Sequence, residues 1–484
     1  MNATRASAPS LRDQVRSAVL WRSGTQVFGQ LVAWAATFLV IRILTPADYG
    51  LYAMTGVVLA LLALVNGYGL ANALIREREV SPQLVRQLFG MLIVLNLALA
   101  ALQLAVAPLV ADYYRQPLVA DMLRVQALLY LTNPFLALGY ALLGRAMDFR
   151  RQAQVNVASA LIGAAAALAG ALGGLGVWTL VVAPLAQMGS RALGMALTAG
   201  AWVRPSFAFR GAWRLAGFGG AMTLSSLFWF VQTQADVAIA GRAFDAHELG
   251  IYSTALFLAQ IFVTKLVPPL NEVAFSAFAR VQEDRAAFAA GFLKSVRVVA
   301  LVALPFCLGL AATAEPLVAV ALGPKWLETA PVVRVLALAM PFATLQVLFA
   351  PAVNAAGRPG LVTWTSVLGA VLMPVAFLIG IDWGAVGMAV AWLAAYPLLT
   401  ALSARWMLPA IGVRGRELLT ALAPPLVAAV AMAAIVVLFG RWLPETSEAA
   451  RLVLLVAAGA LAYAGWLAVF ARDRLGEALA LVRG

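Results

Sequence analysis

The sequence has one cysteine, one histidine and few charged residues. Only 11% of its 484 residues are charged, whereas soluble domains carry roughly 25%. The single cysteine, Cys307, excludes an internal disulfide and a cysteine-based metal site. The single histidine, His247, lies in a polar turn without neighbours at metal-ligand spacing, which favours a solvated side chain. The scarcity of charge predicts a protein whose solvent is largely lipid.

Apolar runs fill most of the chain, which is 63% hydrophobic. A membrane-spanning helix needs about 20 apolar residues. We therefore predict an all-α, polytopic membrane protein with about fourteen transmembrane helices. They are expected at roughly 18–42, 50–74, 88–111, 118–142, 153–173, 176–199, 214–240, 250–275, 292–313, 330–354, 361–381, 384–408, 418–440 and 449–470. No connection between them is long enough for a soluble domain. The first run is too long for a signal-peptide core, so we expect a retained helix.

The basic residues are unevenly distributed, and the net charge is +13. If both termini face the cytoplasm, most of the 34 lysine and arginine residues, Arg191 among them, fall in cytoplasmic segments. This distribution follows the positive-inside rule, so the charge indicates membrane topology and gives no reason to expect nucleic acid as a partner.

An internal repeat divides the chain. Residues 41–52, IRILTPADYGLY, match residues 241–252, GRAFDAHELGIY. Two further matches follow in the same order and at nearly the same shift, 123–131 with 333–341 and 175–181 with 383–389. Ordered matches at one shift indicate a duplication. We predict an N-terminal six-helix lobe at 1–205, a C-terminal six-helix lobe at 206–410, and helices 13 and 14 with a cytoplasmic tail at 411–484.

An even number of spans separates the repeated segments, so the two lobes are expected to share one orientation around a central cleft. The acidic turns of the repeat have a structural interpretation as helix N-caps, and they contain Thr45, Asp48, Asp245 and Glu248. Arg42 and Arg242 end the preceding helices, where their stems can extend to the outer interface. Both arginines are candidates for the outer mouth of the cleft.

Polar side chains recur on one face of several predicted spans. A charge at bilayer depth costs at least about 2.5–3.5 kcal/mol, so it needs a partner, water or a function. The first span carries Arg22, Gln26 and Gln30, the second Asn66, the seventh Trp229, Gln232 and Asp236, and the eighth Lys265 and Glu272. The eighth is interrupted by Pro268 and Pro269, which should kink or break the helix. One alternative is purely structural, with Asp236 paired to Lys265, or Glu272 paired to a nearby arginine.

The duplication gives Asp236 to one lobe only, because its counterpart in the first half is Ala36. A role in pinning helices in both lobes would not predict that asymmetry. We therefore expect Asp236 and Glu272 to be coupling or gating groups, with H⁺ or Na⁺ as the coupled ion.

The block D-x-x-x-x-G-R, acidic turn, G-I-Y at 236–252 resembles the central signature of bacterial oligosaccharide flippases, the Wzx-type polysaccharide transporter family. Its twin at 41–52, the WRSGTQVFGQLVAW helix and the fourteen-span plan extend the resemblance over essentially the whole chain. That family belongs to the superfamily of MATE exporters and lipid II flippases. The resemblance implies alternating-access transport of polyprenyl-diphosphate-linked oligosaccharide repeat units across the bacterial inner membrane, for O-antigen, capsule or exopolysaccharide synthesis.

The resemblance also assigns roles to the polar faces. Arg22 and Lys265 would bind the diphosphate, and Trp229 would stack on sugar rings. The amides that would bind sugar hydroxyls are Gln26, Gln30, Asn66 and Gln232. Expected partners are the lipid-linked oligosaccharide, membrane lipids, a polysaccharide polymerase and a chain-length regulator. No cofactor, metal or catalytic residue is expected.

Three alternatives stay open. A MATE-like cation-coupled multidrug antiporter would want an acidic, aromatic cavity, and a lipid II flippase would share the superfamily fold. From a different class, a membrane glycosyltransferase or polymerase would need a long external loop with catalytic groups, and no such constellation is visible. No Walker-type loop is present, so ATP is not expected to be the direct energy source.

Overall fold

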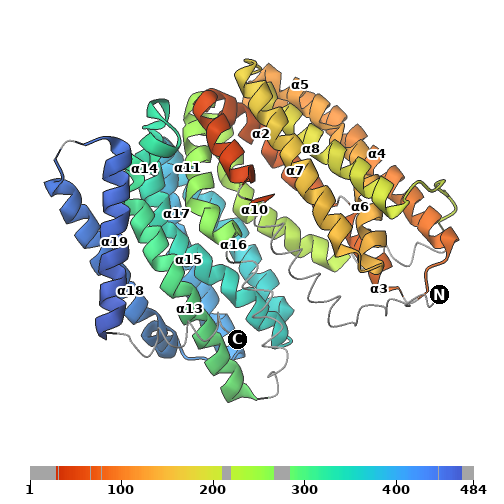
Figure 1. Cartoon of the computed structure of the whole chain (residues 1–484). Coiled ribbons are helices and arrows are strands. Elements are labelled where there is room, and N and C mark those ends of the chain that lie inside the picture. Colours follow the sequence, from red (N-terminus) through yellow and green to blue (C-terminus); the bar gives the residue numbers. More distant parts are fainter. Residues whose placement is uncertain are drawn as a thin grey trace, which may run out of the picture. The chain divides into compact units, whose positions relative to one another are not determined.

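The computed structural model describes residues 29–470 except 31, 66, 78, 210–219, 266, 268–283 and 445 (Figure 1). These residues form helices and loops without a strand, which confirms the all-α prediction. The chain separates into two compact units, with the division between Leu224 and Ser225. We call them unit 1 and unit 2 and describe each by itself.

The helices of unit 1 are Val32–Ile43, α2 (Pro46–Ala63), α3 (Tyr68–Arg76), α4 (Pro82–Tyr114), α5 (Pro117–Gln126), α6 (Leu129–Arg145), α7 (Phe149–Leu172) and α8 (Trp178–Ala199). Gly67 adopts a left-handed φ of 90° between α2 and α3, a conformation that favours glycine and interrupts a helix. The apolar run predicted as one span at 50–74 is therefore two helices.

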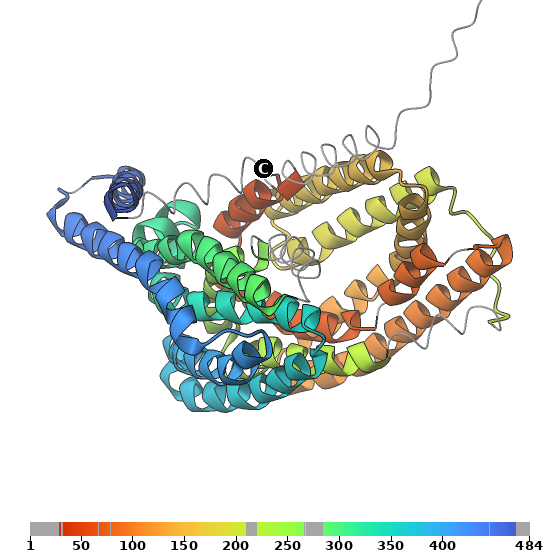
Figure 2. The same cartoon turned by 90° about the horizontal axis from the view of Figure 1, so that it is seen from below.

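Unit 2 contains α10 (Gly220–Ala243), which crosses the boundary, α11 (Ala246–Lys265), α13 (Arg285–Ala312), α14 (Ala314–Ala321), α15 (Thr329–Ala355), α16 (Pro359–Gly380), α17 (Gly384–Ala410), α18 (Gly415–Trp442) and α19 (Glu448–Phe470), with short 3₁₀ turns η1 (Pro324–Trp326) and η2 (Ile381–Trp383). The last two helices pack within this unit, α18 against α13 and α19 against α14 and α18 (Figures 1 and 2).

Eleven helical stretches of the described residues are long and apolar enough to cross a membrane. One of them, Pro359–Ala410, contains both α16 and α17. The chain is therefore a multi-pass membrane protein by length and composition of its helices. The count of fourteen stays a prediction, because the predicted spans 18–42, 214–240 and 250–275 each include residues outside the described part.

The acidic turns of the repeat cap helices as predicted. At α2, the Asp48 amide donates to Thr45 Oγ1 (3.3 Å), and the Thr45 amide donates to Asp48 Oδ2 (2.9 Å). At α11, the Glu248 amide donates to Asp245 Oδ1 (2.8 Å). Each bond satisfies an amide that the first turn of a helix otherwise leaves without a partner.

The repeat places an acidic side chain against a glycine in both units, an arrangement that we call the acid–glycine corner. In unit 2 the amide of Ala385 donates to Glu248 Oε1 (3.0 Å), and a Cβ on Gly384 would lie 2.6 Å from that oxygen. In unit 1 a Cβ on Gly176 would lie 3.3 Å from Asp48 Oδ1. Both glycines have positive φ, 67° and 54°. Segments that match in sequence therefore also match in geometry, which supports duplication.

Helices α16 and α17 approach closely at two glycines on either side of η2. A Cβ on Gly380 would lie 2.6 Å from the carbonyl oxygen of Gly387, and a Cβ on Gly387 would overlap the carbonyl oxygen of Gly380. Close backbone approach through small residues is a common way for membrane helices to pack. The two helices can hold this geometry only while both positions are glycine.

Candidate functional site

Asp236 lies on α10 with no part of its side chain exposed. The Tyr252 hydroxyl donates to Asp236 Oδ2 (2.8 Å), and the Val237 amide donates to Asp236 Oδ1 (2.8 Å). The Trp392 Nε1–H in turn donates to the Tyr252 hydroxyl (2.8 Å). This chain of hydrogen bonds connects α10, α11 and α17 within unit 2, so the aspartate fixes three helices at one point.

Aromatic rings and an amide surround this chain. Trp392 stacks on Tyr396 with ring centroids 4.8 Å apart and an interplanar angle of 9°. The Tyr396 side chain lies beside that of Gln232, which is 1% exposed and lies about one helical turn before Asp236 on α10. We call Gln232, Asp236, Tyr252, Trp392 and Tyr396 the Asp236 cluster.

Glycine on α16 makes room for the amide of the cluster. A Cβ on Gly369 would overlap Gln232 Oε1, so a side chain at this position would displace Gln232. The other amide atom, Gln232 Nε2, is buried without a hydrogen-bond partner among the described residues. A buried polar group without a partner costs about 1–3 kcal/mol.

No described lysine or arginine forms an ion pair with Asp236. Lys265, the partner considered from the sequence, is exposed at the end of α11. An ionised carboxylate buried without a countercharge is strongly disfavoured, so such a group takes up a proton or associates with a cation. The site can therefore bind one proton or one monovalent cation, which neutralises the negative charge of the buried carboxylate. No group of three or more metal-binding side chains occurs among the described residues.

The other sequence-predicted residues are distributed differently. Arg22, Gln26, Asn66 and Glu272, and the Pro268–Pro269 break, lie outside the described residues, and their roles stay predictions. Gln30 is partly buried, and Trp229 is 43% exposed on α10. Arg42 and Arg242 are exposed, each one residue before the end of its helix. The structure brings Gln232 and Asp236 into one cluster and leaves Trp229 and Lys265 outside it.

The sequence did not predict the partners of Asp236 or the buried polar pairs of unit 1. It did not predict a role for Tyr252, Trp392 or Tyr396. Tyr252 is the last residue of the block at 236–252, and its hydroxyl donates to Asp236, the first residue of the same block. Unit 1 holds two uncharged polar pairs. Its Gln126 Nε2–H donates to Thr55 Oγ1 (3.1 Å), and its Tyr130 hydroxyl donates to Gln103 Oε1 (3.0 Å).

Comparison with known proteins gives consistent relatives along the chain. The family described as "Polysaccharide biosynthesis protein" matches residues 39–331. The chain is 26% identical to the succinoglycan biosynthesis transport protein ExoT of Rhizobium meliloti (strain 1021) over 83% of its own length and 80% of that protein. It is 23% identical to the lipopolysaccharide biosynthesis protein WzxC of Escherichia coli (strain K12), covering 68% of the chain and 67% of WzxC.

Two solved structures show the same fold. The lipid II flippase MurJ in an inward closed conformation has a TM-score of 0.75 at 12% identity, covering 94% of this chain and 100% of that one. An inward-facing multidrug resistance MATE family transporter of the MOP superfamily has a TM-score of 0.62 at 14% identity, covering 82% and 98%. These similarities show a fold that the chain shares with both structures.

Proposed function

Because the chain belongs to the polysaccharide biosynthesis protein family, we propose that it is a flippase for polyprenyl-diphosphate-linked oligosaccharide repeat units. It would move them across the cytoplasmic membrane for synthesis of a surface polysaccharide. The observation that carries the proposal is the match over 80% of a relative named as a biosynthesis transport protein, together with the eleven candidate spans among the described residues. The fold that the chain shares with a lipid II flippase further supports a lipid-linked substrate.

The proposed substrate makes three physical demands on a transporter. Its diphosphate needs cations, its sugar hydroxyls need amides, and its lipid tail can stay in the bilayer. Arg22 and Lys265 are proposed for the diphosphate, and exposed Trp229 offers a ring for a sugar face. Translocation would proceed by alternating access of two lobes. Nothing in this scheme requires a catalytic step, and we propose that the protein is not an enzyme.

The Asp236 cluster is proposed as the coupling site, loaded by H⁺ or Na⁺. Its acid is buried without a described cation, so loading changes the charge of a buried group that ties α10 to α11 and α17. A change of that kind shifts an equilibrium between two conformations only if the ion binds one of them better. The same cluster, an acid beside aromatic rings, would also suit a cation-coupled drug antiporter, which is the second candidate.

A deletion strain tests the flippase proposal against the antiporter. Without the gene, we expect surface polysaccharide to fall by at least about 10-fold, because a charged headgroup crosses the bilayer centre unaided only at a cost of at least about 2.5–3.5 kcal/mol. Lipid-linked repeat units should accumulate in the inner leaflet. Mass spectrometry of extracted lipids and gels of surface polysaccharide measure both, and reintroducing the chain should restore them. Normal polysaccharide with increased sensitivity to cationic drugs would instead support the antiporter.

We further propose a bacterial inner-membrane location, cytoplasmic termini, and a polymerase and chain-length regulator as partners. The excess of basic residues in the segments assigned to the cytoplasm supports this orientation. Since the only native cysteine, Cys307, is buried, single introduced cysteines can be labelled selectively. A membrane-impermeant reagent is expected to label Ala246→Cys at the start of α11 in intact cells and to leave Gln83→Cys at the start of α4 unlabelled. The reverse pattern would invert the topology.

A further inference from the structure

The segment 201–209, which follows α8, is held against the start of α4 by its backbone. The Ser206 amide donates to the Arg86 carbonyl oxygen (2.8 Å), and Arg86 Nε–H donates to the Arg204 carbonyl oxygen (3.0 Å). A Cβ on Gly90 of α4 would overlap the Ser206 carbonyl oxygen, so only a glycine at this position allows the approach. The segment therefore has a fixed place on unit 1.

The segment carries two large aromatic side chains that the protein does not cover. Trp202 is 63% exposed, and Phe207 is 59% exposed. The ring of Trp202 packs on Phe135 of α6 with centroids 5.8 Å apart, and α8 ends at Ala199, three residues before Trp202. Aromatic residues just beyond the end of a span are typical of the membrane–water interface, where one side of the ring is apolar and the other is hydrated.

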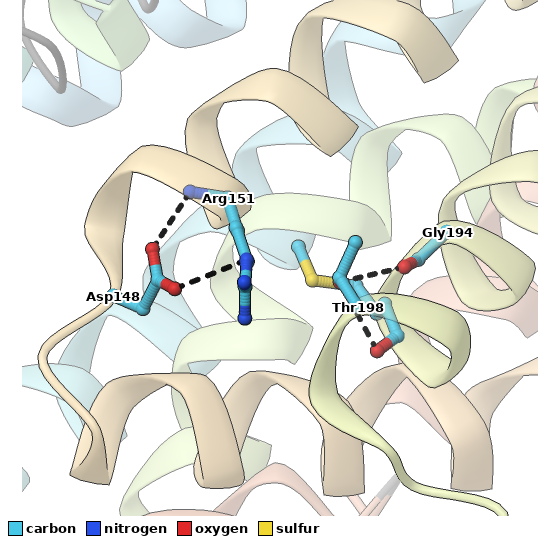
Figure 3. Close-up of polar contacts among 5 residues, drawn as sticks. Asp148, Arg151, Gly194 and Thr198 are labelled. Atoms are coloured by element: carbon cyan, nitrogen blue, oxygen red, sulfur yellow. Dashed lines mark hydrogen bonds and ion pairs between the residues drawn. The ribbon is translucent and has the colours of Figure 1, made fainter.

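Two arginines of the same region have no acidic partner. The side chains of Arg86 and Arg204 are exposed, and no described carboxylate forms an ion pair with either of them. By contrast, Arg151 at the start of α7 pairs with Asp148, with Arg151 Nε 3.3 Å from Asp148 Oδ2 (Figure 3). Because the Arg86 guanidinium lies against the backbone of Arg204, the two positive charges form one surface, which we call the arginine patch. An anion would reduce the repulsion between them.

We propose that the arginine patch, together with Trp202 and Phe207, binds the headgroup of an anionic phospholipid. A guanidinium donates two parallel hydrogen bonds to phosphate oxygens, and the aromatic rings suit the level between headgroups and acyl chains. A phosphate that belongs to a bilayer lipid contacts both the arginines and the rings, whereas a free phosphate contacts the arginines alone. The cytoplasmic termini proposed above place this end of unit 1 at the cytoplasmic leaflet, whose negative surface attracts basic segments.

Quenching of a fluorophore by brominated lipids tests this proposal on the full-length protein in nanodiscs. Ala208 is exposed within the segment, and the native Cys307 is buried, so Ala208→Cys can be labelled selectively with bimane. The nanodiscs contain phosphatidylcholine and a graded fraction of brominated phosphatidylglycerol or brominated phosphatidylcholine. We expect the brominated phosphatidylglycerol to quench at a lower mole fraction, and we expect this preference to fall at high salt, because exposed charges are screened.

Substitution of the arginines separates the headgroup contact from general contact with lipid. Arg86→Gln and Arg204→Gln are each expected to lower the preference for phosphatidylglycerol by about 5-fold, the contribution of one basic residue near an anionic membrane surface. The matched control is Arg124→Gln, which removes an exposed arginine paired with Asp121 in the same unit and should keep the preference of the unmodified protein.

Two further variants test the geometry. Gly90→Ala keeps both arginines but displaces Ser206 from α4, so it should lower the preference as the loss of an arginine does. The double variant Trp202→Ser, Phe207→Ser should weaken quenching by both brominated lipids, because it removes the apolar contact and keeps the charges. If Gly90→Ala is not recovered folded, the substitutions of the exposed residues decide the question.

Three results would overturn the proposal. The first is equal quenching of the unmodified protein by the two brominated lipids, and the second is an unchanged preference when Arg86 and Arg204 are both replaced by glutamine. The third is displacement of phosphatidylglycerol by an equal fraction of farnesyl diphosphate, which would assign the patch to an isoprenoid diphosphate. None of these measurements depends on transport, so their failure leaves the flippase proposal intact, and normal polysaccharide in the deletion strain would leave the lipid site intact.

Discussion

Replacing Asp236 by asparagine is expected to leave the protein folded and to abolish the dependence of transport on an ion gradient. Asparagine keeps the size of the side chain and one acceptor, so Tyr252 or Val237 keeps its bond while the other is weakened. We expect a cost of about 1 kcal/mol in the free energy of unfolding. Gradient dependence should be lost because the substituted group no longer exchanges a proton or a cation. Transport into inverted membrane vesicles, with and without an imposed gradient, measures it.

A second variant, Tyr252→Phe, tests the contribution of the hydrogen bonds between helices separately from the charge of Asp236. Tyr252→Phe keeps the carboxylate but removes the hydroxyl that bonds Asp236 and accepts from Trp392. It should destabilise the protein by about 1–3 kcal/mol, because a buried indole N–H loses its partner, and it should retain gradient dependence. If Asp236→Asn responds to the gradient as the wild type does, Asp236 is a structural residue and coupling lies elsewhere.

Replacing Gly387 by alanine is expected to cause the largest loss of folded protein. The added methyl group would overlap the carbonyl oxygen of Gly380, and it would lie 2.6 Å from the Trp383 side chain. Both obstacles are close to the backbone, so neither can rotate away as the end of a long side chain would. Overpacking of this kind costs typically about 1–3 kcal/mol and occasionally more. Membrane yield and thermal unfolding in detergent measure the effect.

The matched control is Gly360→Ala, near the start of α16, where nothing lies within 4 Å of an added Cβ. It should have normal yield, because alanine is tolerated in a helix better than glycine by about 1 kcal/mol. Since Trp392 lies on α17 beyond Gly387, any Gly387→Ala protein that does fold should also show altered gradient dependence. Equal stability of the two variants would mean that α16 and α17 are not held together at the glycines.

The sequence was informative where the pattern is local. Helix class follows from apolar runs, and the caps at Thr45 and Asp245 follow from residues three positions apart. Asp236 could be selected because a carboxylate within an apolar run has to be compensated. Its partner Tyr252 is 16 residues away, whereas the next hydrogen bond, from Trp392 to Tyr252, joins residues 140 apart. Nothing in a single sequence indicates which distant tryptophan closes such a chain.

The register between helices was the other property that could not be predicted. A Cβ on Gly163 of α7 would lie 2.8 Å from the Gln187 side chain, and one on Gly194 of α8 would lie 2.8 Å from that of Val155. These close approaches depend on how α7 and α8 are aligned, which apolar runs in a single sequence do not indicate.

The acid–glycine corners bring the first turn of one helix against the start of another inside each unit. In unit 2, for instance, the N-terminal ends of α11 and α17 are joined through Glu248 and Ala385. A spin label placed beside such a corner therefore follows its unit as a whole and not the fraying of a single helix end. The duplication thus provides one labelling position in each unit. The width of the distance distribution measured between two such spin labels reports how much the two units move relative to each other.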